Sequence, residues 1–353
     1  MNGYLSRRSM LKGVAAGAAA AMTVGISQRT DAADERNHAM RVCRYEHQDN
    51  ICVGLYEDNT LLPIGAAAAR CPDTAAMAED LLENTTLLDL LVHGRHEQAA
   101  RAIQEWAQRN PDACDGIRLP VSEVRLLRPI QTPGKMLLLA GNYGAHIAES
   151  GGVAPEREET FPYVFMKPAT TFNDPDAPIP IPAVSPDHID YECELGVIIG
   201  RPCKHVSEEE ALDCVAGYTV VNDISDRQYK PFPNRKKRGK DDFFDWLHGK
   251  WHDGFCPMGP CATSAHGITD PQALNLTLRV NGEVRQDAST AQMIFPVAAI
   301  IAFIAQSVTL LPGDVIATGT PDGVGSASGQ YLRPGDTLEA AITNIGVLRN
   351  TMA

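Results

Sequence analysis

Two glutamates, one residue apart, stand at the head of an apolar run in the middle of the chain. Glu192 and Glu194 flank Cys193, and the run Gly196 to Ile199 that follows reads as a buried strand. Side chains at positions i and i+2 of a strand share a face, so the two carboxylates project together and repel unless something neutralises them. A hard divalent cation with oxygen ligands would do so. The alternative, an edge strand with both carboxylates in water, fits the apolar continuation less well.

A third carboxylate closes another apolar run. Asp223 follows Tyr218 to Asn222 directly, which places it at the end of a core strand, where it can supply a further ligand. Three carboxylates, with water in the remaining positions, suit Mg²⁺ or Mn²⁺, and suit Ca²⁺ less well. The sequence therefore predicts a divalent-metal site at Glu192, Glu194 and Asp223.

An imidazole and a carboxylate lie three residues apart after the apolar run Met136 to Ala140. If a short helix begins near Tyr143, His146 and Glu149 are i, i+3 neighbours on one face. A carboxylate beside an imidazole raises its basicity and fixes its tautomer. Such a pair can take a proton from a water held near a metal. A surface His–Glu pair is the alternative, but the neighbouring glycines favour a functional segment.

Two further segments could contact a substrate. Gly249 to Pro260 is dense in turn residues, and its Lys250 could stabilise a developing enolate, although the spacing alone favours a solvated loop lysine. Thr318 to Gly325 is a glycine-rich loop whose backbone N–H groups and Thr320 hydroxyl could hold a carboxylate. The loop lacks the lysine of a phosphate-binding loop, so it does not indicate a nucleotide site.

These residues need a scaffold, and the apolar pattern beyond Val124 is mainly that of strands. One long helix is expected over Ala291–Val308, and two turns of one type, 311–314 and 332–336, each lead into a strand. The pattern predicts an α+β fold, mainly β, built as a twisted β-sandwich or roll over residues 126–353. The apolar runs that indicate strands are 136–140, 163–166, 196–199 and 215–221.

The preceding part of the chain has a different pattern. Arg41 to Ile64 alternates polar and apolar residues around turn pairs, which predicts two or three short strands. Asp73 to Gln108 carries apolar residues at helical spacing. We therefore predict a small α/β domain over residues 40–125.

The first 33 residues are typical of a twin-arginine export signal. Arg7 and Arg8 precede a small, weakly apolar run, Gly13 to Ile26. That run, of about 14 residues, is too short to span a bilayer easily. The prediction is a signal over 1–33, recognition by the twin-arginine export machinery and a periplasmic location. The alternative is a tail that contains two arginines by chance.

Composition excludes some classes of function. Hydrophobic residues are 44% and charged residues 21%, which is ordinary for a globular protein. The net charge of −13 argues against a nucleic-acid partner, which would require clustered cations. The basic cluster Arg235 to Arg238 is followed by Asp241 and Asp242, which favours a solvated loop. None of the nine cysteines forms a CxxC pair, which argues against a thiolate zinc site, and no disulfide can be assigned.

Taken in order, these segments resemble the fumarylacetoacetate hydrolase family. The resemblance is strong over residues 130–350 and weak over 40–130, and several separate motifs in one order make a chance match improbable. The matching pieces are Gly141–Glu149, Pro162–Pro168, Asp190–Gly196, Asn222–Asp223, Gly249–Pro260, Met293–Phe295, Thr318–Gly325 and Leu332–Asn350.

The resemblance implies a mixed β-sandwich roll, usually a homodimer, with Mg²⁺ or Mn²⁺ on the three acidic residues. It implies that His146 and Glu149 activate water, and it assigns Lys250 to the active site. It also implies contacts with a small oxo-acid substrate, with the role of Lys167 the least defined. The residues expected to make these contacts are Tyr143, Lys167, Arg227, Gly319 and Thr320.

Three departures from the family pattern lie near the expected mouth of the site. Gln228 stands where the family often has an acidic residue, 235–240 looks inserted, and Trp251 and His252 follow the lysine where Ser or Thr is common. They concern substrate identity rather than metal chemistry. The implied function is cleavage of a C–C bond in an acylpyruvate-like 2,4-dioxo acid through a metal enolate. An isomerase, tautomerase or decarboxylase of a 2-oxo acid, or a non-catalytic exported ligand-binding protein, are the alternatives.

Overall fold

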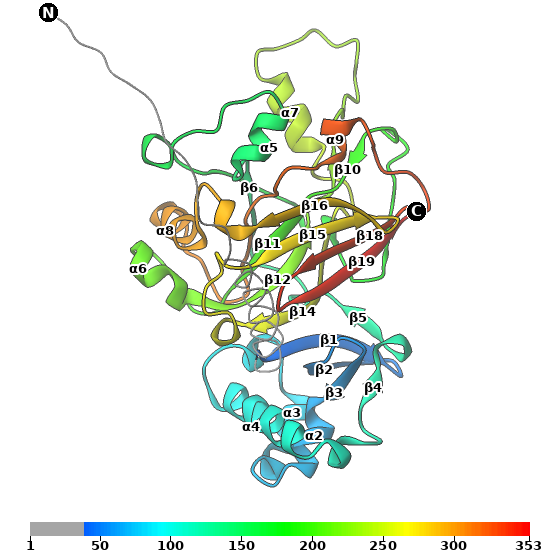
Figure 1. The fold of residues 1–353 in the computed structure, drawn as a ribbon, viewed down its shortest axis with the longest axis vertical. Coiled ribbons are helices and arrows are strands. Elements are labelled where there is room, and N and C mark those ends of the chain that lie inside the picture. The colour runs from blue at the N-terminus through cyan, green and yellow to red at the C-terminus, as the bar shows by residue number, and fades with distance from the viewer. Residues whose placement is uncertain (1–38) are drawn as a thin grey trace, which may run out of the picture. The chain divides into compact units, whose positions relative to one another are not determined.

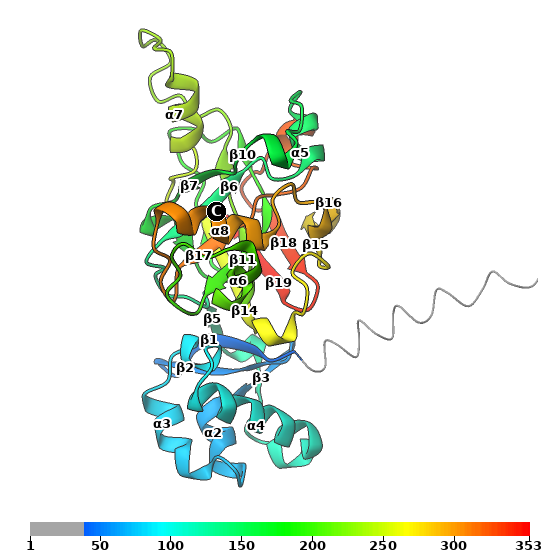
Figure 2. The same cartoon turned by 90° about the vertical axis from the view of Figure 1, so that its left-hand side faces the viewer.

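The computed structural model describes residues 39–353, which form one compact unit. The predicted export signal lies outside the described residues. Between residues 39 and 353, no helix is long and apolar enough to cross a membrane. Figures 1 and 2 show a mixed α and β fold in which strands dominate.

The larger sheet has twelve strands and carries the residues of interest near its centre. Its order is β4-β3-β2-β1-β14-β12-β11-β17-β6-β7, with β5 on β1 and β8 on β14. The strands are β1 Arg41–His47, β2 Asn50–Tyr56, β3 Thr60–Pro63, β4 Leu119–Pro120, β5 Arg125–Leu127, β6 Met136–Ala140, β7 Tyr163–Met166, β8 Phe172–Asn173, β11 Cys193–Ile199, β12 Val215–Asn222, β14 Cys256–Ser264 and β17 Val315–Ala317.

A second sheet of five strands, in the order β16-β15-β18-β19-β9, faces the first. Leu195 and Val197 of the large sheet share one buried cluster with Leu276 and Leu338 of the small sheet, so the apolar faces pack together. This is the predicted α+β sandwich roll. The remaining strands are β9 Pro178–Ile179, β10 Ile189–Asp190, β13 Ser225–Asp226, β15 Asn275–Val280, β16 Glu283–Ser289, β18 Thr337–Ile342 and β19 Gly346–Met352, with β10 and β13 forming a separate pair.

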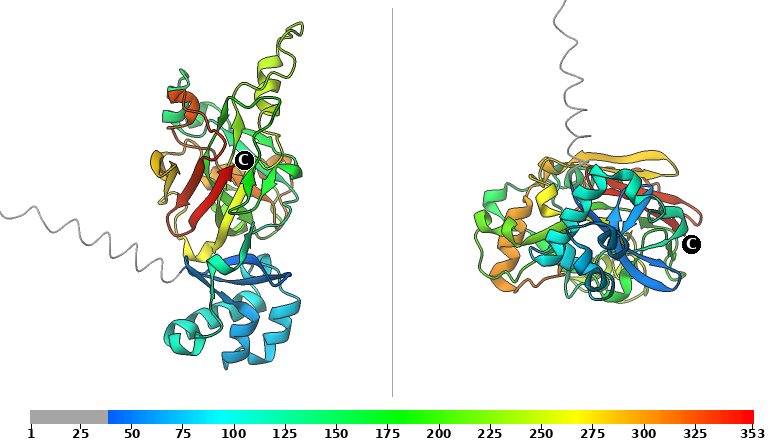
Figure 3. Two further views of the ribbon diagram at one scale, coloured as in Figure 1. Left: turned by 90° about the vertical axis from the view of Figure 1, so that its right-hand side faces the viewer. Right: turned by 90° about the horizontal axis from the view of Figure 1, so that it is seen from below.

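Helices lie at both ends of the larger sheet. Figure 3 shows α2 to α4 beside β1–β3, where they close a second apolar cluster. The helices are α2 Ile64–Arg70, α3 Ala78–Glu83, α4 Arg95–Arg109, α5 Gly144–Glu149, α6 Glu208–Ala211, α7 Asp241–His248, α8 Val297–Ser307 and α9 Gly325–Ser328.

The strand predictions for the N-terminal region are confirmed, since β1, β2 and β3 lie within the predicted stretch 41–64. The large sheet is continuous beyond that region, because β1 pairs with β14 through Val42 and Ala262. A domain boundary near residue 125 stays a prediction.

The long helix predicted over Ala291–Val308 is wrong at its beginning. Helix α8 starts only at Val297, directly after Pro296, because proline lacks an N–H and its ring clashes with a preceding helical turn. The residues before the proline are used differently. Met293 forms an isolated bridge with Tyr143, and the N–H of Ile294 donates to the Asn142 carbonyl at 2.8 Å.

The basic cluster before α7 is only partly solvated. Lys237 and Arg238 are largely exposed, as predicted, but Arg235 is more buried and forms two ion pairs. Its Nε lies 3.1 Å from Asp241 Oδ2, and its Nη2 lies 2.5 Å from Asp245 Oδ2. These pairs attach the loop to the first two turns of α7.

Candidate metal centre

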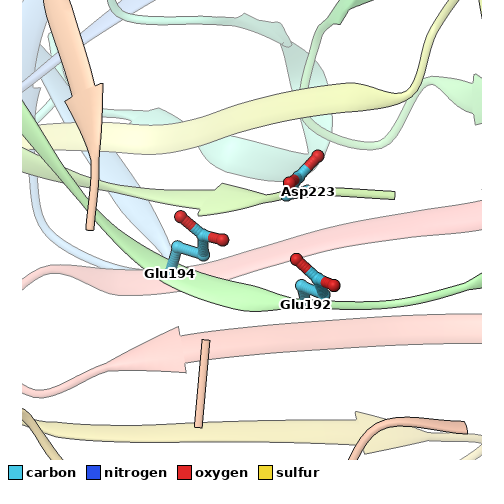
Figure 4. Close-up of side chains that lie close together, drawn as sticks. All are labelled: Glu192, Glu194 and Asp223. Atoms are coloured by element: carbon cyan, nitrogen blue, oxygen red, sulfur yellow. The ribbon is translucent and has the colours of Figure 1, made fainter. Parts of the chain in front are cut away.

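The pairing of β11 with β12 brings the three predicted carboxylates together. Cys193 lies opposite Asn222, so Glu192 stands beside Asp223, whose N–H donates to the Glu192 carbonyl at 2.9 Å. One carboxylate oxygen from each of Glu192, Glu194 and Asp223 lies within 4.8 Å of the others, and all three residues are buried. Figure 4 shows the three carboxylates gathered at the ends of the two strands.

Cations neutralise two of the three carboxylates. Lys250 Nζ donates to Glu192 Oε2 at 2.8 Å and to Asp223 Oδ2 at 2.6 Å. Burial opposes the charge of Glu192, but Lys250 and Arg227 outweigh it and hold the pKa of Glu192 well below its usual range. Burial likewise works against the Lys250 ammonium, while Asp223 and Glu192 overcome it and raise the pKa of Lys250. Lys250 therefore stays protonated and is not the solvated lysine that spacing alone favoured.

Glu194 is different, because within residues 39–353 no ion pair neutralises it. Its Oε2 accepts the N–H of Gly319 at 2.8 Å, while its Oε1 has no hydrogen-bond partner. Burial, and the nearby carboxylates of Asp223 and Glu192, raise the pKa of Glu194 well above its usual range. A fully buried carboxylate oxygen with no partner, beside two other carboxylates, fits a divalent cation with oxygen ligands.

Buried polar atoms without a hydrogen-bond partner gather around the triad. Among the described residues there are five, and four come from Glu194, Tyr143, Thr318 and Arg227. Burial and the neighbouring charge of Glu194 raise the pKa of Tyr143, which places its hydroxyl near that carboxylate. Arg227 Nη2 lies 2.7 Å from Glu192 Oε1 without the angles of a hydrogen bond. Buried polar groups nearly always have partners, so these four atoms indicate a place for a polar ligand.

The predicted His–Glu pair forms on α5. His146 Nδ1 lies 2.7 Å from Glu149 Oε1, and Glu149 Oε2 accepts the N–H of Gly323 at 2.9 Å. A neutral imidazole that donates from Nδ1 to an ionised carboxylate has Nε2 as its acceptor nitrogen, and that nitrogen can act as a base. His146 is close enough to Glu192 to help lower the pKa of that carboxylate. The dyad and the acidic triad therefore belong to one site.

Lys167 is buried beneath Asp223. Its Nζ donates to Asp223 Oδ1, to the Ile224 carbonyl at 2.9 Å and to the Phe255 carbonyl at 2.6 Å. An ammonium has three donors, and these contacts engage all of them. In this arrangement Lys167 fixes Asp223, and its predicted contact with substrate stays a prediction.

Gly319 and Thr320 are also engaged by the protein. Gly319 has a φ of +88°, and an added Cβ would come within 2.9 Å of Asn142 Cβ, so only glycine fits there. The Thr320 hydroxyl donates to the Cys193 carbonyl at 3.1 Å and accepts from Gln286 Nε2 at 2.9 Å. The two residues thus attach the glycine-rich loop to β11, and their predicted contacts with substrate remain untested.

Asp190 is a positioning residue that the sequence reading missed. Its carboxylate accepts Arg227 Nε at 2.8 Å and the N–H groups of Gly325 and Ser326 at 2.6 and 2.9 Å. It therefore aims the arginine and fixes the end of the glycine-rich loop. Asp190 continues the alternate spacing of Glu194 and Glu192 toward the N-terminus, and this spacing could have indicated it.

Asp226 was also missed, and it holds the chain on both sides of Lys250. Its N–H donates to the Gly249 carbonyl at 2.9 Å, and its Oδ2 lies 3.3 Å from His252 Nε2. The contact between Asp226 and His252 depends on both side chains, and His252 belongs to one of the three departures from the family pattern. We interpret the two contacts of Asp226 as a clamp that holds the backbone on both sides of Lys250.

Comparison with known proteins decides the family. The model of the fumarylacetoacetate (FAA) hydrolase C-terminal region matches residues 135–353, which include every residue of the site described above. The chain belongs to the fumarylacetoacetate hydrolase family.

Members of the family with different reactions are similar to this chain. The 2,4-didehydro-3-deoxy-L-rhamnonate hydrolase of Sphingomonas sp. (strain SKA58) is 41% identical over 228 residues, which are 64% of this chain and 75% of that protein. A mitochondrial oxaloacetate tautomerase of Xenopus laevis is 39% identical over 231 residues, 65% of this chain and 68% of that protein. Hydrolysis and tautomerisation thus both occur among relatives.

A solved structure in the family carries a metal. Maleylpyruvate hydrolase from Sphingobium sp. SYK-6, in complex with manganese(II) and pyruvate, superposes with a TM-score of 0.64 at 27% identity. The match covers 89% of this chain and 99% of that one. A relative therefore binds a divalent metal, and this chain has an acidic triad that could do the same.

Proposed function

We propose that this chain is a divalent-metal-dependent hydrolase that cleaves the C–C bond between the acyl group and the pyruvate part of an acylpyruvate-like 2,4-dioxo acid. One observation carries the proposal: the unpartnered Glu194 oxygen lies in a buried acidic triad that also adjoins a His–Glu dyad and a protonated lysine. Hydrolases among the relatives support this reaction class.

Mg²⁺ or Mn²⁺ would be held by Glu192, Glu194 and Asp223, and would supply Lewis acidity and a template for the oxo-acid end of the substrate. Charge supports an anionic substrate. A divalent cation would add two positive charges to the triad, beside the Lys250 ammonium and the Arg227 guanidinium.

His146 begins the reaction as a general base. Its Nε2 takes a proton from water while the water oxygen adds to the acyl carbonyl carbon, and Glu149 stabilises the imidazolium that forms. The bond between that carbon and the methylene then breaks, and its electron pair remains on the pyruvate part as an enolate. The Lys250 ammonium stabilises the negative charge. The proton returns from His146 to the methylene carbon, which gives pyruvate and a carboxylic acid.

Arg227 and Tyr143 are the proposed direct contacts for the substrate carboxylate, because each has a buried polar atom without a hydrogen-bond partner. Thr320 and Gly319 would border the same end of the substrate from the glycine-rich loop. Lys167 would act through Asp223, whose carboxylate it fixes.

Tautomerisation is the second candidate, and the similarity to an oxaloacetate tautomerase favours it. The same groups could move a proton between the oxygen and carbon of an enol without adding water. The two candidates differ in product, because hydrolysis yields two acids whereas tautomerisation changes only the keto–enol ratio.

We also propose that the protein is exported through the twin-arginine machinery to the periplasm and acts as a homodimer. Cell fractionation of the variant with Arg7→Lys and Arg8→Lys tests the proposed location, because loss of the arginine pair should abolish export. Sedimentation equilibrium tests the dimer, and a monomer at working concentration would contradict it.

The direct test is turnover by the purified chain with Mg²⁺ or Mn²⁺ on acylpyruvates and oxaloacetate, followed by ultraviolet loss of the enol. Wild-type protein should release pyruvate from acetylpyruvate. His146→Ala should lower kcat by about 10²–10⁴-fold while metal binding persists, and His266→Ala, at an exposed histidine, is the matched control. Wild-type turnover by His146→Ala would contradict the mechanism. Tight ligand retention without turnover of any substrate would favour a ligand-binding protein.

A further inference from the structure

An apolar hollow of about 690 Å³ lies between the edge strand β7 and helices α7 and α8. Its size is within the range of small-molecule sites, roughly 300–1,000 Å³. We call it the aromatic hollow. Its lining residues are Ala140, Phe161, Pro162, Tyr163, Val164, Phe165, Phe243, Trp246 and Phe303.

Lys250 connects this hollow to the acidic triad. The ammonium that donates to Glu192 and Asp223 also lies over the Phe165 ring, 5.5 Å from its centroid, and 5.8 Å from the centroid of Trp246. The two rings meet edge to face at 5.0 Å and both line the hollow. In Figure 2, α7, which carries Trp246, stands beside the end of the molecule that carries β7.

The substrate is long enough to extend beyond Lys250. With C–C bonds of about 1.5 Å, the four carbons from the carboxylate to the acyl carbonyl of an acylpyruvate span roughly 4 Å. This span exceeds the 2.6–2.8 Å between Lys250 Nζ and the carboxylate oxygens of the triad. An acyl substituent that extends from the triad on the side of the lysine meets Phe165 and Trp246, whose rings lie beside the ammonium.

The lining selects the chemistry of that substituent. Among the described residues that line the hollow there is no charged side chain, so a second carboxylate would lose water without gaining a counter-ion. Phe161, Tyr163 and Phe243 are 57%, 67% and 54% exposed, an amount of aromatic surface that a bound apolar group would cover favourably. Arg235 fixes this wall by its ion pairs with α7.

We propose that the aromatic hollow binds the acyl substituent, and that the substrates are acylpyruvates with an aromatic or medium-length alkyl acyl group. The inference rests on the proposed hydrolase function. Selectivity is expected mainly from burial of the substituent, because one methylene in a hydrophobic site already changes discrimination by about tenfold or more.

The test compares benzoylpyruvate with acetylpyruvate on the metal-loaded full-length protein. Wild-type kcat/KM should favour benzoylpyruvate by at least about tenfold. Phe243→Ala should lower that ratio by about fivefold or more, chiefly through KM, since its ring lines the hollow but does not contact Lys250. Phe232→Ala is the matched control, because Phe232 is an exposed phenylalanine outside the lining, and it should leave the ratio unchanged.

The outcomes separate this inference from the proposed function. Turnover of acetylpyruvate with no preference for benzoylpyruvate, or a ratio unaffected by Phe243→Ala, overturns the inference and leaves the hydrolase intact. If neither compound is turned over, the proposed hydrolase function is wrong, and calorimetric titration with benzoylpyruvate then tests binding in the hollow. Weaker binding by Phe243→Ala than by wild type supports the inference. Equal binding by the two proteins overturns it. A change in sedimenting mass for Phe243→Ala, without a change in selectivity, identifies a subunit interface and also overturns it.

Discussion

The acidic triad and the aromatic hollow share a lysine but are built in different ways. The triad stands at the ends of two central strands, β11 and β12, and its atoms are positioned by backbone amides, buried cations and neighbouring carboxylates. The hollow is formed by side chains on the edge strand β7 and on two helices, with several rings partly in water. The first region has four buried polar atoms without a hydrogen bond, and the second exposes mainly aromatic rings.

The different construction of the two regions suggests that the triad governs reactivity and the hollow governs selectivity. A substitution in the triad removes a charge that neighbouring residues of the site pair with, so it should affect every substrate alike. A change in the hollow alters only the shape and area offered to one end of a substrate. The segment 235–240, predicted to be an insertion, is attached through Arg235 to helix α7 beside the hollow. The predictions below test whether the two regions separate in this way.

Glu194→Gln should have the largest effect. The amide keeps the shape of the protonated side chain but cannot supply a charged ligand, so kcat/KM should fall by about 10³-fold or more for every substrate. The metal-free protein should be at least as stable as wild type, because a buried carboxylate with a raised pKa is removed. Calorimetric metal titration and thermal melts measure both, with Glu283→Gln as the exposed control. Unchanged metal affinity would remove Glu194 from the site.

The two buried lysines should differ in kind. Both substitutions should destabilise the fold, by about 3–5 kcal/mol, because each removes a buried donor: Lys167 from Asp223 and two carbonyls, and Lys250 from Glu192 and Asp223. Lys250→Met should in addition lower kcat by about 10²–10³-fold, since the enolate loses its cation. Urea unfolding and steady-state kinetics on both variants make the comparison. An equal loss of kcat in the two variants would contradict the division of roles.

Metal removal should destabilise the protein more as pH rises. The raised pKa of Glu194 means that, above the ordinary glutamate pKa of about 4.3, the unfolded chain ionises freely while the metal-free folded chain resists ionisation, so folding stability from this group falls with pH. Glu192 has a lowered pKa, so its contribution to folding stability rises with pH, but only below the ordinary glutamate pKa. The difference in melting temperature between Mn²⁺-loaded and chelator-treated protein should grow by about 3–6 °C from pH 5 to pH 8. A constant difference would contradict this account.

The clamp around Lys250 should give the smallest effect. Asp226→Asn keeps the backbone bond to Gly249 but weakens the contact with His252, and we expect kcat to fall by about three- to tenfold with KM nearly unchanged. His252→Asn, which keeps a polar group, should recover part of the activity that His252→Ala loses. Loss of stability without any change in kcat would show that the pair acts on the fold alone.

Local pattern was sufficient where short-range physics decides the structure. Strands β6 and β7 match the predicted bounds because each is an apolar run bounded by turn residues. The His146–Glu149 pair followed from helical spacing, the two glutamates of the triad from alternation along one strand, and Asp223 from its place at the end of another apolar run. The helix at 291–308 was predicted too long because Pro296 and the bridge of Met293 to Tyr143 outweigh helical periodicity.

Contacts between distant segments could not be read in the same way. The role of Asp190 depends on the short pairing of β10 with β13, which brings Arg227 beside it. The aromatic hollow depends on where α7 packs after the 235–240 segment, and no periodicity encodes that position. Only family resemblance indicated that Lys250 belongs to the site, because its two carboxylate partners are about 30 and 60 residues away in the sequence.

The position of β17 in the sheet fixes the order in which the site can be completed during synthesis. β17 lies between β11, which leads from the acidic triad, and β6, which leads to His146. Both of those strands leave the ribosome long before β17, and chains begin to fold from the N-terminus while still being made. A nascent chain lacking residues 315–317 therefore has no strand to join the metal ligands to the base. The acidic triad and the His–Glu dyad can therefore come together only when nearly the whole polypeptide has been made.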